Sequence, residues 1–176
     1  QLQHLEITRD VASRFNNQMG ETFVIPEAKI DEQVMIILGT DGNKMSKSRN
    51  NFINIFLPEK QLRKQVMSIE TDSTPLEDPK NPDTDNVFAI YKLLSSPEQI
   101  EEMRENYLKG GYGYGHAKQA LYELILEKYA DARIKFNELM DDKATLDAFL
   151  ENGAFKAREV AQGVLKRTRK QLGLKI

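Results

Sequence analysis

An α/β segment followed by an all-α helical bundle, with helix predominating overall, is the architecture we expect from this sequence. The continuous apolar run Val34–Leu38 is rich in β-branched residues and favours a buried strand. From Asn86 onward, apolar residues recur at helical spacing almost to the end of the chain. Between them, residues 71–86 combine three prolines with five acidic residues and predict a long surface loop. We therefore expect a mixed α/β part over 1–57 and a helical part over 58–176.

The α/β part begins with a predicted helix. Leu2–Asn17 carries an apolar stripe at helical spacing, and Gly20 follows as a stop. Thr22–Pro26 is a short extended piece that ends at a proline. Phe52–Leu57 alternates well enough to predict a second short strand.

The helical part is divided by prolines and glycines. Pro58 suits the first turn of a helix, and Ser96 followed by Pro97 is typical of a helix start. Glycine-rich residues 110–115 break the chain again, and Gly153 separates the last two predicted helices. The expected helices are Pro58–Ser68, Val87–Leu94, one following Ser96, His116–Met140, Asp142–Leu150 and Ala154–Leu172.

Composition narrows the function classes. The 176 residues include no cysteine, which excludes disulfides and thiolate metal sites. The longest apolar run has five residues, whereas a membrane helix needs about 20, and no signal peptide is apparent. The chain starts without methionine, as if inside an element, so we expect it to begin within a larger protein.

Charge is unevenly distributed although the net charge is only −2. Residues 152–176 hold seven lysines and arginines against one acid, Glu159. Such an asymmetry suggests contact with a polyanion, although a solvated basic helix face explains it as well. The residues concerned are Lys156, Arg158, Lys166, Arg167, Arg169, Lys170 and Lys175.

The most informative segment is the loop sequence Lys-Met-Ser-Lys-Ser over residues 44–48. Two ammonium groups on a mobile loop can stabilise the charge that develops on a pyrophosphate leaving group. The Ser46 hydroxyl can add a hydrogen bond to a phosphate oxygen. The segment follows the predicted strand Val34–Leu38 after a glycine-containing turn, where a loop can reach a ligand beyond the carboxyl end of a sheet. No Walker A sequence occurs anywhere in the chain, and the glycines of 111–115 have the wrong spacing for a dinucleotide fingerprint.

At these residues the chain resembles the class I aminoacyl-tRNA synthetases, of which Lys-Met-Ser-Lys-Ser is the second signature. Four further segments resemble the tryptophanyl branch of that family: 1–10, 23–28, Thr71-Asp72-Ser73 and Asn86–Leu94. The Tyr112-Gly113 turn with Lys118 is similar as well. The resemblance covers nearly the whole chain.

The resemblance implies specific roles. Lys44 and Lys47 would be the catalytic residues that contact the ATP phosphates. Val34 and Met45 would lie against the adenine, and Gln1 would contact the amino acid. The expected ATP loop comprises Lys44, Met45, Ser46, Lys47 and Ser48. Residues 1–57 would be the C-terminal part of a Rossmann-like catalytic domain, and 58–176 an anticodon-binding type of helical domain.

The implied partners are ATP, with Mg²⁺ carried by the nucleotide, L-tryptophan and tRNA(Trp). The family further implies a cytoplasmic homodimer without a protein-bound structural metal. The His-Ile-Gly-His signature of the family is absent, so we expect this chain alone to be inactive. Two alternatives remain: a tyrosyl-type synthetase of the same class, and a non-enzymatic helical RNA-binding module that needs the basic helices but not the lysine loop.

Overall fold

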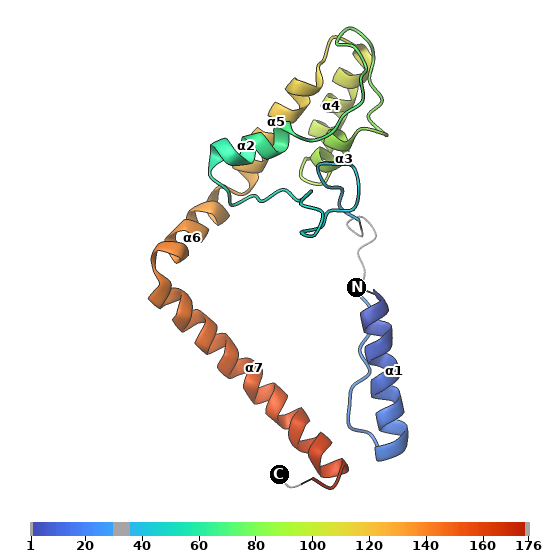
Figure 1. The fold of residues 1–176 in the computed structure, drawn as a ribbon, viewed down its shortest axis with the longest axis vertical. Helices are drawn as coiled ribbons and strands as arrows, with labels where there is room; N and C mark the ends of the chain where they lie inside the picture. The colour runs from blue at the N-terminus through green and yellow to red at the C-terminus, as the bar shows by residue number, and fades with distance from the viewer. Residues whose placement is uncertain (1, 30–35, 175–176) are drawn as a thin grey trace. The chain divides into compact units, whose positions relative to one another are not determined.

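Seven α-helices form the part of the chain described by the computed structural model, which covers residues 2–29 and 36–174. The chain divides into two compact units, one of residues 1–30 with 139–176 and one of residues 31–138 (Figure 1). The prediction of a predominantly helical chain is confirmed.

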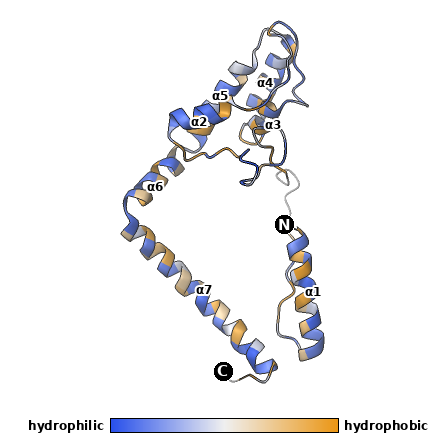
Figure 2. Ribbon diagram, in the orientation of Figure 1, coloured by the Kyte–Doolittle hydropathy of each residue, from blue (hydrophilic) through white to orange (hydrophobic). Residues whose placement is uncertain are grey.

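The core of the 31–138 unit is built from four helices. Helix α5, Tyr114–Lys128, packs against α2, Glu59–Met67, and α3, Asn86–Lys92, while α4, Pro97–Lys109, contacts α3. Apolar residues of these helices form one buried cluster, and hydrophobic positions along the ribbon are coloured orange in Figure 2. The buried cluster contains Leu62, Val66, Ile69, Val87, Phe88, Ile90, Tyr91, Met103, Tyr107, Ala117, Leu121, Tyr122, Leu124 and Ile125.

Local sequence sets three helix starts, of which the one at Ser96 and Pro97 is as predicted. The Ser96 hydroxyl accepts from the Gln99 amide, the Gln99 side chain accepts in return from the Ser96 amide, and Pro97 occupies the first turn of α4. Pro58 precedes the first turn of α2, and the Asp85 carboxylate accepts from the Phe88 amide at the start of α3.

The loop over residues 71–85 is mostly exposed, as predicted, but it contains a buried lysine. Lys80 is only 2% exposed, and its ammonium donates to the carbonyl oxygens of Pro75, Leu76 and Asp78 at 2.9, 3.3 and 3.2 Å. It also lies 5.3 Å from the ring centroid of Tyr114. A buried cation therefore organises this segment, which the sequence predicted only as exposed.

The predicted helix His116–Met140 is interrupted. Helix α5 ends at Lys128, and α6 runs from Ala130 to Asp141. Beyond the break, the Arg133 guanidinium donates to the carbonyl oxygens of Ile55 and Leu57. Phe136 stacks on Phe56 with ring centroids 4.5 Å apart. These contacts with a distant segment lie just beyond the interruption.

The other unit holds α1, Leu2–Met19, and α7, Lys143–Gln171. After α1 the chain turns back on Asn16, whose side-chain oxygen accepts from the amides of Thr22 and Phe23 at 3.0 and 2.9 Å. Two separate helices, Asp142–Leu150 and Ala154–Leu172, were expected, and this expectation is wrong because α7 continues through Gly153. One glycine costs a helix only about 1 kcal/mol relative to alanine, too little to end it.

The sheet expected for residues 1–57 is not formed by the described residues. Phe52–Leu57 is not a strand, because the Asn54 side chain accepts from the Phe56 amide at 3.0 Å and the Asn54 carbonyl accepts from the Leu57 amide. Such local bonds favour a turn over a ladder. Residues 34 and 35 of the other predicted strand lie outside the described residues, and its last residue, Leu38, forms an isolated antiparallel bridge with Lys44.

None of the helices in residues 2–29 and 36–174 combines the length and the hydropathy that a membrane span would require.

Candidate functional site

The loop carrying Lys-Met-Ser-Lys-Ser is closed at its base by backbone hydrogen bonds. The Gly39 amide donates to the Asn43 carbonyl at 2.7 Å, and the Met45 amide donates to the Ile37 carbonyl at 2.8 Å. Gly42 has a φ of +71°, which suits glycine, and Asn43 donates its amide to the Asp41 carboxylate at 3.0 Å. The tight turn 39–43 thus brings residues 44–46 back beside Ile37.

The Asn51 side chain links separate positions of this loop through hydrogen bonds. Its side-chain oxygen accepts from the Ser46 amide at 2.7 Å, and its side-chain nitrogen donates to Asp41 at 2.6 Å and to the Lys44 carbonyl at 3.2 Å. The Asn51 amide is the main reason that the pKa of Asp41 lies below its usual value, because it stabilises the charged carboxylate. Asn51 itself is only 2% exposed, in an otherwise exposed segment.

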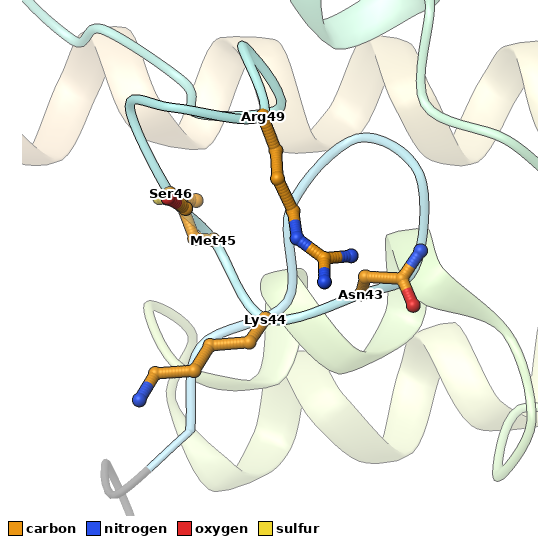
Figure 3. Close-up of a pocket in the computed structure, with 5 residues that line it drawn as sticks. All are labelled: Asn43, Lys44, Met45, Ser46 and Arg49. Carbon is orange, nitrogen blue, oxygen red and sulfur yellow. The ribbon is translucent and has the colours of Figure 1, made fainter.

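An open cavity of about 520 Å³ lies against the loop. Its lining is Asn43, Lys44, Met45, Ser46 and Arg49 (Figure 3). In this view the Arg49 side chain extends toward Asn43 and the Lys44 ammonium extends the other way. The lining therefore carries two cationic groups and a hydroxyl, a combination suited to an anionic ligand.

The predicted site residues are partly brought together. Lys44, Met45 and Ser46 line this one cavity. Lys47 and Ser48 belong to the same loop but do not line it; the Ser48 hydroxyl is 2.8 Å from that of Ser46. Within the described ranges, neither Lys44 nor Lys47 takes part in an ion pair. The two other predicted contacts, Gln1 and Val34, lie outside the described residues.

Two residues at the site were not predicted. Arg49 lines the cavity directly, and its place immediately after the five-residue motif was the available signal. Asn51 supports the loop from inside, and nothing in its sequence context separates it from an ordinary turn residue.

The loop is tied to the helices beside it. The Glu70 amide, after α2, donates to the Thr40 carbonyl at 2.7 Å. The Asn86 side chain, at the start of α3, donates to the Glu70 carbonyl at 3.0 Å. A Cβ at Gly42 would approach the Asn86 side chain to 2.7 Å, so the turn and the helix start are in close contact.

Met45 joins the loop to the apolar core. Besides the polar cavity, it lines a second cavity of about 290 Å³. The other lining residues are Ile37, Ile53, Ile55, Ile90, Leu93, Leu94, Ile125 and Tyr129. Met45, which stands between Lys44 and Ser46 in the motif, therefore faces both the polar cavity and the apolar one.

Behind the loop, buried polar groups stabilise the start of α3. The Asp85 carboxylate accepts from the Tyr107 hydroxyl at 2.8 Å and from the Phe88 amide at 2.8 Å. Burial raises the pKa of Asp85 and is also the largest cause of the raised pKa of Tyr107. No group of three or more His, Asp or Glu side chains suited to a metal ion is found in the part of the chain that the structure describes.

Comparison with known proteins gives this arrangement a family. The model of the family described as tRNA synthetases class I (W and Y) matches residues 1–130. Because this match covers most of the chain, the chain belongs to the class I tRNA synthetases specific for tryptophan and tyrosine.

Two of the most similar curated relatives are tryptophan–tRNA ligases. The tryptophan–tRNA ligase of Campylobacter jejuni is 47% identical over 174 residues, which are 99% of this chain and 54% of the relative. The ligase of Rhodopirellula baltica is 46% identical over 175 residues, 99% of this chain and 55% of the relative. The chain thus spans about half the length of the curated relatives it matches.

A solved structure supports the same placement. Tryptophanyl-tRNA synthetase from C. jejuni, complexed with ADP and tryptophan, matches with a TM-score of 0.83 and 47% identity. The match covers 98% of this chain and 54% of that one.

Proposed function

We propose that this chain is the C-terminal part of a tryptophan–tRNA ligase, which activates tryptophan with ATP and transfers it to tRNA(Trp). The observation that carries the proposal is 47% identity to a tryptophan–tRNA ligase over nearly the full length of this chain. The open cavity against Lys44, Ser46 and Arg49 supports it, because its cationic and hydroxyl groups suit the phosphates of ATP.

In the proposed reaction, a tryptophan carboxylate oxygen attacks the α-phosphorus of ATP and pyrophosphate leaves. Lys44 and Lys47 neutralise the charge that accumulates on the departing pyrophosphate, which is the catalytically useful moment for an ammonium group to act. Ser46 and Ser48 donate hydrogen bonds to phosphate oxygens. Mg²⁺ arrives with the nucleotide and shields its charge.

The remaining contacts extend this scheme. Met45 and Val34 lie against the adenine, and Gln1 contacts the amino acid. Residues 1–57 belong to a Rossmann-like catalytic domain. The rest of that domain corresponds to the part of the relatives' sequence that this chain does not span. Residues 58–176 form the tRNA-facing domain. We further propose a homodimer acting in the cytoplasm.

The test joins this chain to the N-terminal half of the C. jejuni relative and measures amino-acid-dependent exchange of pyrophosphate into ATP. Tryptophan should support exchange, and this chain alone should not catalyse it. Tyrosine-dependent exchange without tryptophan would assign the chain to the tyrosyl type instead.

The lysine loop is tested in the same hybrid. Lys47→Ala should lower the exchange rate by a factor on the order of 100 or more while leaving tRNA binding nearly intact, because one group that stabilises the transition state is removed. Lys60→Ala, at an exposed lysine of α2, is the matched control and should leave exchange unchanged. If Lys47→Ala also leaves exchange unchanged, the loop has no catalytic role and the RNA-binding alternative is favoured.

A further inference from the structure

Asn51 is unusual among the loop residues because it is polar, buried and fully bonded. It is 2% exposed, whereas its neighbour Asn50 is exposed. The oxygen of its side chain accepts from the backbone amide of Ser46. The nitrogen of its side chain donates both to the Asp41 carboxylate and to the Lys44 carbonyl. These partners also fix the orientation of the amide group, since a backbone N–H must meet the oxygen and a carboxylate must meet the nitrogen.

The three partners lie at different points of the loop. Asp41 belongs to the glycine-containing turn, while Lys44 and Ser46 are two residues of the predicted ATP-binding segment. The Asn51 carbonyl additionally accepts from the Thr40 amide at 2.8 Å. A single residue thus fixes the entry, the middle and the exit of the loop relative to one another.

The glycine opposite is shaped to admit this side chain. A Cβ at Gly39 would come within 2.5 Å of the Asn51 side chain and of its carbonyl oxygen, closer than real atoms approach one another. Position 39 and Asn51 are therefore packed against each other, which is independent evidence that the location of the amide is specific.

We propose that Asn51 is a positioning residue, whose side chain holds the backbone of Lys44 and Ser46 so that the Lys44 ammonium and the Ser46 hydroxyl meet the phosphates of ATP. The inference rests on the proposed function for its consequence, but not for its geometry. Asn51 touches no reacting atom and acts through the two residues that it holds.

The geometry is tested on this chain alone by amide hydrogen exchange. Asn51→Ala should accelerate exchange of the Ser46 amide about fivefold or more, because the acceptor of that amide is removed. The Phe88 amide, which donates to Asp85 in α3, should keep its protection and serves as the internal control. Unchanged protection of Ser46 would overturn the inference whatever the enzyme does.

The consequence is tested in the hybrid by exchanging donor and acceptor. Asn51→Asp brings a second carboxylate to a site 2.6 Å from Asp41 and removes both side-chain donors. It should lower kcat for pyrophosphate exchange by a factor on the order of 100, as expected for misplaced reacting groups, with the KM for tryptophan unchanged. The double variant Asp41→Asn with Asn51→Asp restores a donor–acceptor pair at the same place and should recover at least about a tenth of the wild-type kcat.

Asn50→Asp is the matched control, since it introduces the same charge one residue earlier and at an exposed position whose φ of 54° aspartate also tolerates. If it lowers kcat as much as Asn51→Asp does, the effect is one of charge and the inference fails. The inference also fails if the double variant folds but shows no recovery. Failure of the proposed function has a different result: the wild-type hybrid would not exchange, or Lys47→Ala would not slow it.

Discussion

A single hydrogen bond lowers the pKa of Asp72, a carboxylate after α2. The Tyr114 hydroxyl donates to the Asp72 carboxylate at 2.6 Å, and this bond is the main reason that the pKa of Asp72 lies below its ordinary value of 3.8. The Thr74 amide donates to the same oxygen at 2.9 Å. Because the folded state favours the charged form, the pair stabilises the fold fully above the unfolded-state pKa and loses that contribution as the pH falls through the lower folded-state pKa.

Tyr114→Phe should therefore move the pKa of Asp72 up toward 3.8. The decrease in stability relative to the wild type should be largest at neutral pH and should shrink as the pH falls below about 4, where the unfolded carboxyl group is itself protonated. The Asp72 titration followed by NMR, with urea unfolding compared between neutral and acidic pH, measures both effects. Tyr112→Phe is the control, since the described residues offer that hydroxyl no hydrogen-bond partner. An unchanged Asp72 titration in Tyr114→Phe would contradict the assignment.

At the level of single residues, the sequence revealed the functional residues that lie together in a recognisable short motif. The motif 44–48 was found because its residues are adjacent, and Lys44, Met45 and Ser46 indeed line one cavity. Asn51 was missed because an asparagine in a polar loop looks the same whether it is solvated or buried. Its role arises only when the turn 39–43 folds back and brings three separate partners to it.

Among the helices, α7 is the one whose length was not predicted from the sequence. It runs for 29 residues because Asp142 caps it and because nothing after Gly153 gives the chain a reason to turn. A Cβ at Gly153 would meet nothing within 4 Å, so the glycine fills no steric need.

Gly153→Ala should accordingly stabilise α7 by about 0.5–1 kcal/mol, through the smaller conformational freedom of alanine in the unfolded chain. Thermal unfolding followed by circular dichroism at the helix band gives the measurement. Gly42→Ala provides the contrast and should destabilise, since that position has a positive φ and a Cβ there would be 2.7 Å from Asn86. Equal effects at the two glycines would show that local conformation does not set the outcome.

The break between α5 and α6 is the reverse case, a helix that the sequence predicts to be continuous and the structure interrupts. Apolar spacing continues through Tyr129 and predicts one helix, because periodicity sees only near neighbours. The helix is interrupted shortly before Arg133, which bonds to the carbonyls of Ile55 and Leu57, 78 and 76 positions away in the sequence. The start of a helix with its own cap, such as the one at Ser96, was predictable, whereas an interruption beside contacts with a distant segment was not.

Over the whole molecule, the helical character was predictable from composition and spacing, while the expected sheet is not formed by residues 2–29 and 36–174. A strand requires a partner, and the described residues provide only the Leu38–Lys44 bridge. Charge distribution, by contrast, is visible directly in the sequence. The basic residues Arg158, Lys166, Arg167, Arg169 and Lys170 all lie along α7, and none is in an ion pair with another described residue.

If α7 contacts tRNA, Arg169→Gln with Lys170→Gln should weaken binding by the hybrid and flatten its salt dependence. The log–log slope should fall by about 0.7–0.9 for each phosphate that the variant no longer neutralises. Lys60→Gln with Lys64→Gln, at exposed positions of α2, removes the same charge elsewhere and should leave the slope nearly unchanged. Filter binding across a series of salt concentrations measures the slope. A slope that both pairs change equally would indicate a general effect of net charge and no particular role for α7.

The buried ammonium of Lys80 has a consequence for how this chain can vary. Segments without regular structure usually accept extra residues, because lengthening a flexible loop costs little entropy. Here three carbonyls between Pro75 and Asp78 converge on one nitrogen, so an inserted residue would pull at least one of them out of reach and leave a cation only 2% exposed incompletely solvated. Homologues are therefore expected to keep the spacing between Pro75 and Lys80 fixed, while gaps and insertions collect elsewhere.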